Sequence, residues 1–257
     1  MSNTNNRSEM VSLIRNKLKS GSISIGSWIQ IPNSTVSEIM GNAGYDWVAI
    51  DMEHGSISLN QLPDIFRGLE LGNTLPLVRL SEGTIYNCKA VLDAGAGGVI
   101  VPMIETAEQL IGVRNASCWP PTGNRGVGFS RANLFGKYFN DYIQEAQNPL
   151  LIAMIENVRA LENLDEILQV TGLDAILIGP YDLSASLNVI SKFDDESFIK
   201  AINYILLKCK EYAIPVGIHV VDPNIELLKS RIKEGYQFIA YSIDSVFLNL
   251  SITNPLI

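Results

Sequence analysis

The stretch LLIAMIENVRALENLDEILQVTGLDAILIGPYDL, residues 150–183, contains two short apolar runs with a helical pattern between them. Runs of this length, at 150–155 and 174–179, are typical of buried strands, and the spacing of apolar residues at 158–168 predicts the intervening helix. A strand, a helix and a second strand in this order form one unit of a parallel sheet.

The same alternation extends along the rest of the chain. Further strands are predicted near 23–29, 46–51, 75–80, 98–102, 214–219 and 237–242, and further helices near 34–43, 59–72, 84–94, 106–117, 195–212 and 224–234. Eight strands with helices between them favour a closed (β/α)8 TIM barrel over an open sheet. The length of 257 residues fits a single domain over 1–257, and Pro255 permits only a short last helix.

Composition excludes several classes of function. The chain is 47% apolar and 18% charged with a net charge of -8, which disfavours a nucleic-acid surface. The polar start, MSNTNNRSEM, lacks the apolar region of a secretory signal, and no run approaches the roughly 20 apolar residues of a membrane helix. Three cysteines without metal-binding spacing are typical of reduced thiols. We therefore expect a cytoplasmic protein that binds neither membrane nor nucleic acid.

One connection is much longer than the others. Segment 118–148 is rich in Gly, Pro, Arg and aromatic residues. Connections of this length usually have a task, and we expect a rim of the site or a subunit contact. Its NRGVG motif, residues 124–128, lacks the spacing of a phosphate loop or dinucleotide fingerprint, so no nucleotide cofactor is indicated.

Polar residues follow the second and third predicted strands. Asp51, Glu53 and His54 come after DWVAI, and Arg79 lies in PLVRL. A histidine oriented by carboxylates can serve as a general base, and a guanidinium can hold a substrate carboxylate through two hydrogen bonds. The structural alternatives are a hydrogen-bonded loop histidine and an ion pair of Arg79 with Asp51 or Glu53.

Two carboxylates follow the adjacent fifth and sixth strands. Glu156 and Asp182 suit a hard divalent cation whose remaining positions are filled by water or substrate oxygens. Singly, Glu156 is equally explained by a salt bridge and Asp182 by a helix cap, but the pair favours a metal site. His219 follows the seventh strand, where it either lines the pocket or is a satisfied structural histidine.

Six motifs in order resemble the HpcH/HpaI aldolase family of class II pyruvate aldolases. They are DWVAIDMEHG, LPLVRL, VLDAGAGGVIVPMIETAEQ, PPTGNRGVGFSRAN, MIENVRALENLDEI and LDAILIGPYDLSASL. The match runs from about Gly26 to Leu187 and more loosely to Asp244. The resemblance implies a barrel enzyme, a carbon-carbon lyase that joins pyruvate to an aldehyde or cleaves a 4-hydroxy-2-keto acid.

The resemblance also assigns a cofactor and its ligands. Glu156 and Asp182 match the carboxylates that hold a divalent metal, which would be Mg²⁺, Mn²⁺ or Co²⁺. Arg79 matches an arginine near the pyruvate oxygens, and Pro180, Tyr181 and Asp182 lie where backbone amides receive the pyruvate carboxylate.

The remaining matched residues concern proton transfer and assembly. His54 matches the residue for acid/base work, and Asp51 matches its neighbour in the site. Asp93 resembles an aspartate that reaches the histidine of a neighbouring subunit, which implies a homo-oligomer, a hexamer or trimer of dimers.

Three departures from the family pattern concern substrate and assembly. Met154 stands where a glutamine is frequent, Tyr181 stands where a small residue is usual, and the last helix is short. Two alternatives stay open: another metal-dependent carbon-carbon lyase that acts on an acyl-CoA or related acid, and a non-catalytic barrel that binds pyruvate or a sugar acid.

Overall fold

Eight parallel strands close into one barrel in the order of the chain. The structure is a computed structural model and describes residues 3–256. Each strand pairs with the next, and the last pairs with the first. The strands are β1 (Ser24–Ile29), β2 (Trp47–Asp51), β3 (Leu75–Arg79), β4 (Gly98–Val101), β5 (Leu150–Ile155), β6 (Ala175–Ile178), β7 (Val216–Val220) and β8 (Phe238–Ile243). All eight predicted strands are confirmed within two residues at either end.

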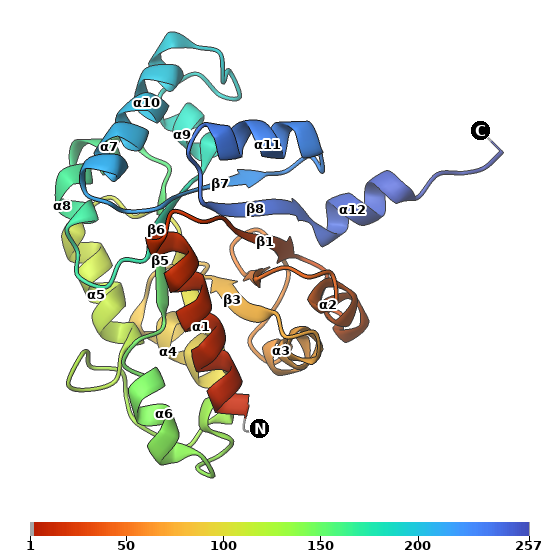
Figure 1. Ribbon diagram of the computed structural model, residues 1–257, viewed down its shortest axis with the longest axis vertical. Coiled ribbons are helices and arrows are strands. Elements are labelled where there is room, and N and C mark those ends of the chain that lie inside the picture. Colours follow the sequence, from red (N-terminus) through yellow and green to blue (C-terminus); the bar gives the residue numbers. More distant parts are fainter. Residues whose placement is uncertain (1–2, 257) are drawn as a thin grey trace.

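Helices surround the barrel on the outside (Figure 1). They are α1 (Asn3–Lys19), α2 (Ser34–Gly41), α3 (Leu62–Leu71), α4 (Ile85–Ala94), α5 (Ala107–Ser117), the 3-10 helix η1 (Arg131–Asn133), α6 (Phe139–Glu145), α7 (Val158–Glu162), α8 (Leu164–Leu168), α9 (Pro180–Ser186), α10 (Glu196–Glu211), α11 (Ile225–Lys233) and α12 (Asp244–Ser251). The helix predicted at 158–168 is two short helices, α7 and α8. The last helix, α12, is short as predicted and projects away from the barrel (Figure 1). No helix within residues 3–256 is long and apolar enough to cross a membrane.

The helix α1 closes the end of the barrel at which the strands begin. Its buried side chains Met10, Ile14 and Leu18 recur every four residues and therefore lie on one face. They pack in one cluster with inward-facing strand residues. Two of these are Trp47 and Phe238, the first residues of β2 and β8, whose stacked rings have centres 4.2 Å apart. The opposite end of the barrel, where the strands finish, is left for the site.

Alternate strand residues face the barrel interior and the helices. In β5, Leu150, Ile152 and Met154 belong to the inner cluster, whereas Leu151 and Ile155 belong to the layer between strands and helices. Because the side chains of a strand alternate between its two faces, the first residue beyond β5 continues the inward series. This alternation determines which residues reach the barrel mouth.

Segment 118–148 lies at the wrong end of the barrel to form a rim of the site. It follows α5 and precedes β5, so it connects a helix to the beginning of a strand. Its helix α6 packs beside α1 (Figure 1), and Glu145 pairs with the buried Arg7. The rim prediction failed because only loops that follow strands gather at the catalytic end of such a barrel. The alternative expectation of a subunit contact stays a prediction.

Candidate active site

A cavity of about 290 Å³ lies at the ends of the strands. Its wall includes the predicted residues His54, Arg79, Glu156, Pro180, Tyr181 and Asp182, together with Trp28, Gln30, Met154, Leu177, Ile178, Gly179, His219, Val221 and Ile243. Among the described residues, none of segment 118–148 contributes to this wall. The strand-end pattern thus brings six predicted residues together.

Asp51 lies behind the wall and holds Arg79 in place. The two residues are register partners in β2 and β3, and Arg79 donates from Nε and Nη2 to the carboxylate at 2.9 and 2.7 Å. Gln30 donates a further hydrogen bond at 2.8 Å. Burial raises the pKa of Asp51, which is 1% exposed, but the hydrogen bonds and charge of Arg79 outweigh burial and hold that pKa below its ordinary value. Asp51 is therefore a fixed anion that orients Arg79.

The ion-pair alternative for Arg79 is therefore observed. Asp51 takes the two-pronged contact that we expected for a substrate carboxylate, and Nη1 pairs with Glu53 at 3.0 Å. The guanidinium also lies over the Trp28 ring, 4.6 Å from its centre. A guanidinium has five N–H groups, so two remain beyond these three contacts. Arg79 can offer the cavity these remaining donors and its charge.

Glu53 and His54 form the next part of the mouth. Glu53 Oε2 lies 3.9 Å from His54 Nε2, and the His54 side chain is 60% exposed. Burial raises the pKa of Glu53, although the charge of Arg79 opposes the rise. The backbone N–H groups of both residues donate to Asp51 Oδ1, which fixes the turn after β2. His54 is thus held by its backbone while its ring stays accessible.

Glu156 is a buried carboxylate that forms no ion pair with any residue of the described range 3–256. It is 2% exposed, and its Oε1 accepts one hydrogen bond, from the Met103 N–H at 2.7 Å. Burial raises its pKa to about 7, and the charges of Glu53 and Asp182 add to the rise. No ion pair to Glu156 is formed within residues 3–256, so the salt-bridge alternative is not observed.

Gly179 provides the space that the Glu156 carboxylate occupies. A Cβ atom at position 179 would lie 2.2 Å from Glu156 Oε2. Only glycine therefore fits between β6 and α9 while the carboxylate keeps this position. The position of the Glu156 carboxylate therefore depends on the absence of a side chain at position 179.

Asp182 lies in the first turn of α9, at the edge of the same cavity. Its side chain is exposed, and no ion pair of Asp182 is formed in the part of the chain that the structure describes. Leu183 donates the first hydrogen bond of the helix, to Gly179. The N–H groups of Tyr181 and Asp182 therefore have no acceptor within the helix, whereas Pro180 has no N–H to offer. Only two of the three predicted backbone donors exist.

Two carboxylates are thus free to bind a divalent cation. Asp51 and Glu53 are committed to Arg79, whereas Glu156 and Asp182 face the cavity without a cationic partner among residues 3–256. No group of three or more His, Cys, Asp or Glu side chains is gathered as metal ligands in this same range. Oxygen donors of this kind suit a hard cation that keeps other positions for water or substrate. The donor set of Glu156 and Asp182 fits such an ion.

Asp93 lies apart from this constellation. It occupies the last turn of α4, which runs back from the catalytic end, and the cations nearest to it are Arg125 and Lys89. Burial raises its pKa. Asp93 therefore does not reach His54 of its own chain, and a role for it in the site stays a prediction about an oligomer.

Several wall residues carry no charge and were not predicted as site residues. Trp28 and Gln30 continue the inward series of β1, and Met154 does so in β5.

His219 meets both expectations stated for it, because it lines the cavity and its Nε2 also contacts the Ser242 carbonyl at 3.2 Å. Since a carbonyl only accepts, the proton lies on Nε2. Burial lowers the pKa of His219 to about 4, so the ring is neutral at pH 7.

Comparison with known proteins identifies the family of the chain. Residues 24–249 match the family model described as HpcH/HpaI aldolase/citrate lyase. A hydroxypyruvate/pyruvate aldolase of Roseobacter denitrificans is 34% identical, with 91% of each chain covered. A 2-keto-3-deoxy-L-rhamnonate aldolase of Salmonella paratyphi A is also 34% identical, covering 93% of this chain and 90% of that protein.

A solved structure extends the comparison to three dimensions. An HpcH/HpaI aldolase/citrate lyase family protein of Burkholderia cenocepacia superposes with a TM-score of 0.86 at 28% identity, covering 93% of this chain and 95% of that chain. The match spans the whole barrel and all the strand ends described above. The chain therefore belongs to the HpcH/HpaI aldolase/citrate lyase family and is a carbon-carbon lyase.

Proposed function

We propose that this enzyme is a metal-dependent pyruvate aldolase, which joins pyruvate to an aldehyde or cleaves the corresponding 4-hydroxy-2-keto acid. The observation that carries the proposal is that one cavity combines two carboxylates available for a metal ion with an arginine and a histidine. Glu156 and Asp182 lack cationic partners in the described chain, while Arg79 and His54 line the same wall. The relatives named as aldolases of hydroxypyruvate, pyruvate and a 2-keto-3-deoxy acid support the same reaction class.

Glu156 and Asp182 would hold the cation, which we propose to be Mg²⁺, Mn²⁺ or Co²⁺. When bound, the cation supplies positive charge beside the keto oxygen that becomes negative as pyruvate loses a methyl proton. Arg79 adds a second positive charge, held in place by Asp51. The free N–H groups of Tyr181 and Asp182 can donate hydrogen bonds to the pyruvate carboxylate at the same edge.

His54 is the proposed acid/base residue. In the cleavage direction its ring takes the proton from the C4 hydroxyl, the C3–C4 bond breaks, and the bonding electrons move towards the keto oxygen. In the synthetic direction it returns the proton to the new hydroxyl. Its ring is 60% exposed, lines the cavity and can therefore reach a bound substrate.

We further propose that the enzyme works as a homo-oligomer, in which Asp93 reaches the site of a neighbouring subunit. Asp93 lies far from His54 along its own chain's barrel, and α12 projects outwards with exposed apolar residues (Figure 1). Light scattering after size-exclusion chromatography measures the assembly. A monomer with full activity would contradict this part of the proposal.

The central experiment is exchange of pyruvate methyl protons with deuterated water, followed by trapping with an aldehyde. We expect exchange with Mg²⁺, Mn²⁺ or Co²⁺ and its loss on chelation. Glu156→Gln should abolish it, whereas Glu162→Gln, an exposed glutamate of α7, should not.

Each failure of this experiment has a distinct meaning. Absence of exchange with all three metals would refute the aldolase. Turnover of an acyl-CoA in its place would identify another lyase of the family. Binding of pyruvate and metal without exchange or turnover would identify a non-catalytic barrel.

A further inference from the structure

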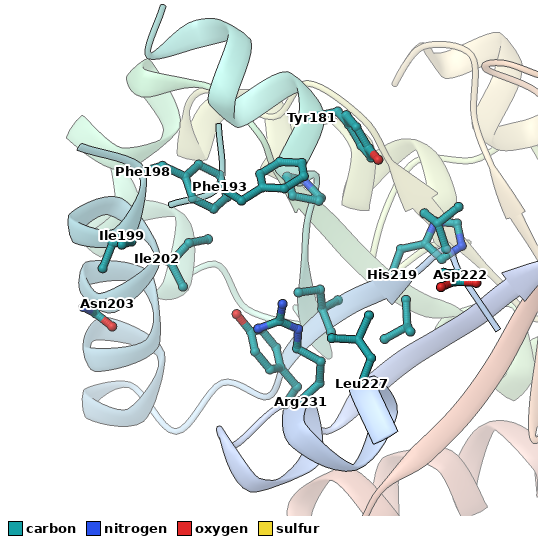
Figure 2. A pocket seen from close by; sticks show the side chains of 15 residues that line it. Tyr181, Phe193, Phe198, Ile199, Ile202, Asn203, His219, Asp222, Leu227 and Arg231 are labelled. Atoms are coloured by element: carbon teal, nitrogen blue, oxygen red, sulfur yellow. The ribbon is translucent and has the colours of Figure 1, made fainter. Parts of the chain in front are cut away.

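A second cavity adjoins the catalytic one. It has a volume of about 350 Å³ and lies between α10 and α11, outside β7. Four residues line both cavities, namely Pro180, Tyr181, His219 and Val221. Figure 2 shows Tyr181 and His219 on the side of this second cavity away from α10. We call this second cavity the side groove, and these shared residues form its border with the catalytic cavity.

The wall of the side groove is mainly aromatic and aliphatic. The Tyr181 and Phe193 rings meet edge to face at 5.2 Å, and Phe193 contacts Phe198 at 5.3 Å. Ile199 and Ile202 of α10 face Leu227 of α11 across the groove (Figure 2). An apolar group that leaves water for such a wall is stabilised roughly in proportion to the area it buries.

The charges of the side groove disfavour an anionic occupant. Its one arginine among the lining residues, Arg231, pairs with Glu234, to which Nη1 donates a hydrogen bond at 2.6 Å. Asp222 places a carboxylate near the junction with the catalytic cavity (Figure 2). His219 is neutral at pH 7, because its burial lowers the pKa to about 4. A carboxylate or phosphate on the substrate would therefore meet the Asp222 carboxylate near the junction, and the one lining arginine is already paired with Glu234.

We propose that the side groove binds the apolar chain or ring of the acceptor aldehyde, which makes the enzyme selective for unbranched alkyl or aryl aldehydes. The inference rests on the proposed aldolase function and names its second substrate by chemical class. The enolate carbon of pyruvate, held in the catalytic cavity, forms its bond to the aldehyde carbon at the junction. The aldehyde substituent then extends between Tyr181 and His219 into the side groove. An aldehyde that carries a second acid group, as from a dicarboxylate or sugar acid, fits this wall poorly.

The test is the rate of aldol addition along a homologous series from acetaldehyde to hexanal. With Mg²⁺ and pyruvate at saturation, kcat/KM for the aldehyde should rise roughly fourfold with each methylene until the groove is filled. Pentanal should exceed succinic semialdehyde, which has a similar length but ends in a carboxylate, by at least about tenfold. A flat series, or preference for succinic semialdehyde, would overturn the inference.

A matched pair of variants separates the groove from the general properties of the protein. Ile199→Trp fills the groove from a position that is 45% exposed, and Leu207→Trp adds the same ring to the same helix at a position that is 55% exposed and outside the groove. The first should remove the dependence on chain length beyond propanal, and the second should retain it. An unchanged series in Ile199→Trp would contradict the groove assignment.

Exchange of pyruvate methyl protons distinguishes a failure of the side-groove proposal from a failure of the proposed aldolase function. Both variants should exchange at the wild-type rate, because neither position lines the catalytic cavity. Exchange together with a flat aldehyde series would overturn only the side groove. Absence of exchange in the wild-type enzyme would overturn the aldolase and the groove together.

Discussion

Replacing Glu156 by glutamine should stabilise the metal-free enzyme while removing its activity. Burial raises the Glu156 pKa from 4.5 to about 7. Between these values the folded protein holds a proton that the unfolded chain has released, so the free energy of unfolding falls as pH rises through this window. The full loss corresponds to roughly 3 kcal/mol above pH 7. Glutamine can keep the hydrogen bond from Met103 but cannot ionise, and the variant should escape this loss.

Urea denaturation of chelated protein at pH 4.5 and pH 8 measures the effect. The variant should gain about 3 kcal/mol over the wild type between these pH values, or roughly 6–12 °C in Tm for a chain of this size. Glu162→Gln, which changes an exposed carboxylate, should follow the wild type. Added Mg²⁺ should stabilise the wild type at pH 8 and leave Glu156→Gln unchanged, because ligands stabilise only the state that binds them. Parallel pH profiles for wild type and Glu156→Gln would refute the reasoning.

Three other variants and one binding measurement probe the site and the scaffold. Gly179→Ala should displace the Glu156 carboxylate and reduce metal affinity at least about tenfold, measured by titration calorimetry; unchanged affinity would show that position 179 does not set the carboxylate. Asp51→Asn should weaken pyruvate exchange and lower the free energy of unfolding by roughly 1–3 kcal/mol, since Arg79 loses its charged contact with Asp51 but keeps that with Glu53; a neutral effect in denaturation would contradict that role. Trp47→Ala should cost roughly 3–5 kcal/mol of stability yet retain exchange at temperatures where it is folded; loss of exchange in the folded variant would refute the separation of the two barrel ends. Pyruvate should raise the affinity for Mg²⁺, and Mg²⁺ that for pyruvate, by the same factor; independent binding in calorimetry would refute a shared site.

The fold was predictable because each strand is a short apolar run followed by a helical pattern. The helix α1 escaped prediction although Met10, Ile14 and Leu18 carry a four-residue spacing, because the polar residues around them obscure the apolar face. Packing details were beyond the sequence. Gly26, for example, leaves space for the Trp47 ring, which would lie 2.1 Å from a Cβ atom at position 26. Such a match between two strands depends on register, which no single segment specifies.

The charged part of the site was predictable from strand ends, and the uncharged part was not. Arg79 and Glu156 could be found because a charged residue directly after a buried run is conspicuous. Trp28 and Gln30 continue the same kind of inward series but resemble ordinary strand residues. Counting alternate positions from each strand into its loop would have identified them.

The placement of Asp93 shows the limit of carrying a motif over by position. Its sequence neighbourhood matches the family, yet the last turn of α4 places it at the far side of its own barrel from His54. A residue on a helix has no strand end to orient it towards the cavity. Its predicted role therefore depends on a second chain and cannot follow from the fold of one.

The ion pairs of the site explain why only two carboxylates remain for the proposed metal ion. Arg79 neutralises part of the charge of Asp51 and Glu53, and those contacts hold the guanidinium over Trp28. Glu156, whose pKa burial raises to about 7, remains with Asp182 for the proposed divalent ion. Two protein ligands would leave most of the coordination shell of this ion to water and substrate, so we expect firm binding only when a keto acid supplies oxygens. We therefore expect the arrangement that destabilises the empty site to couple metal binding to pyruvate.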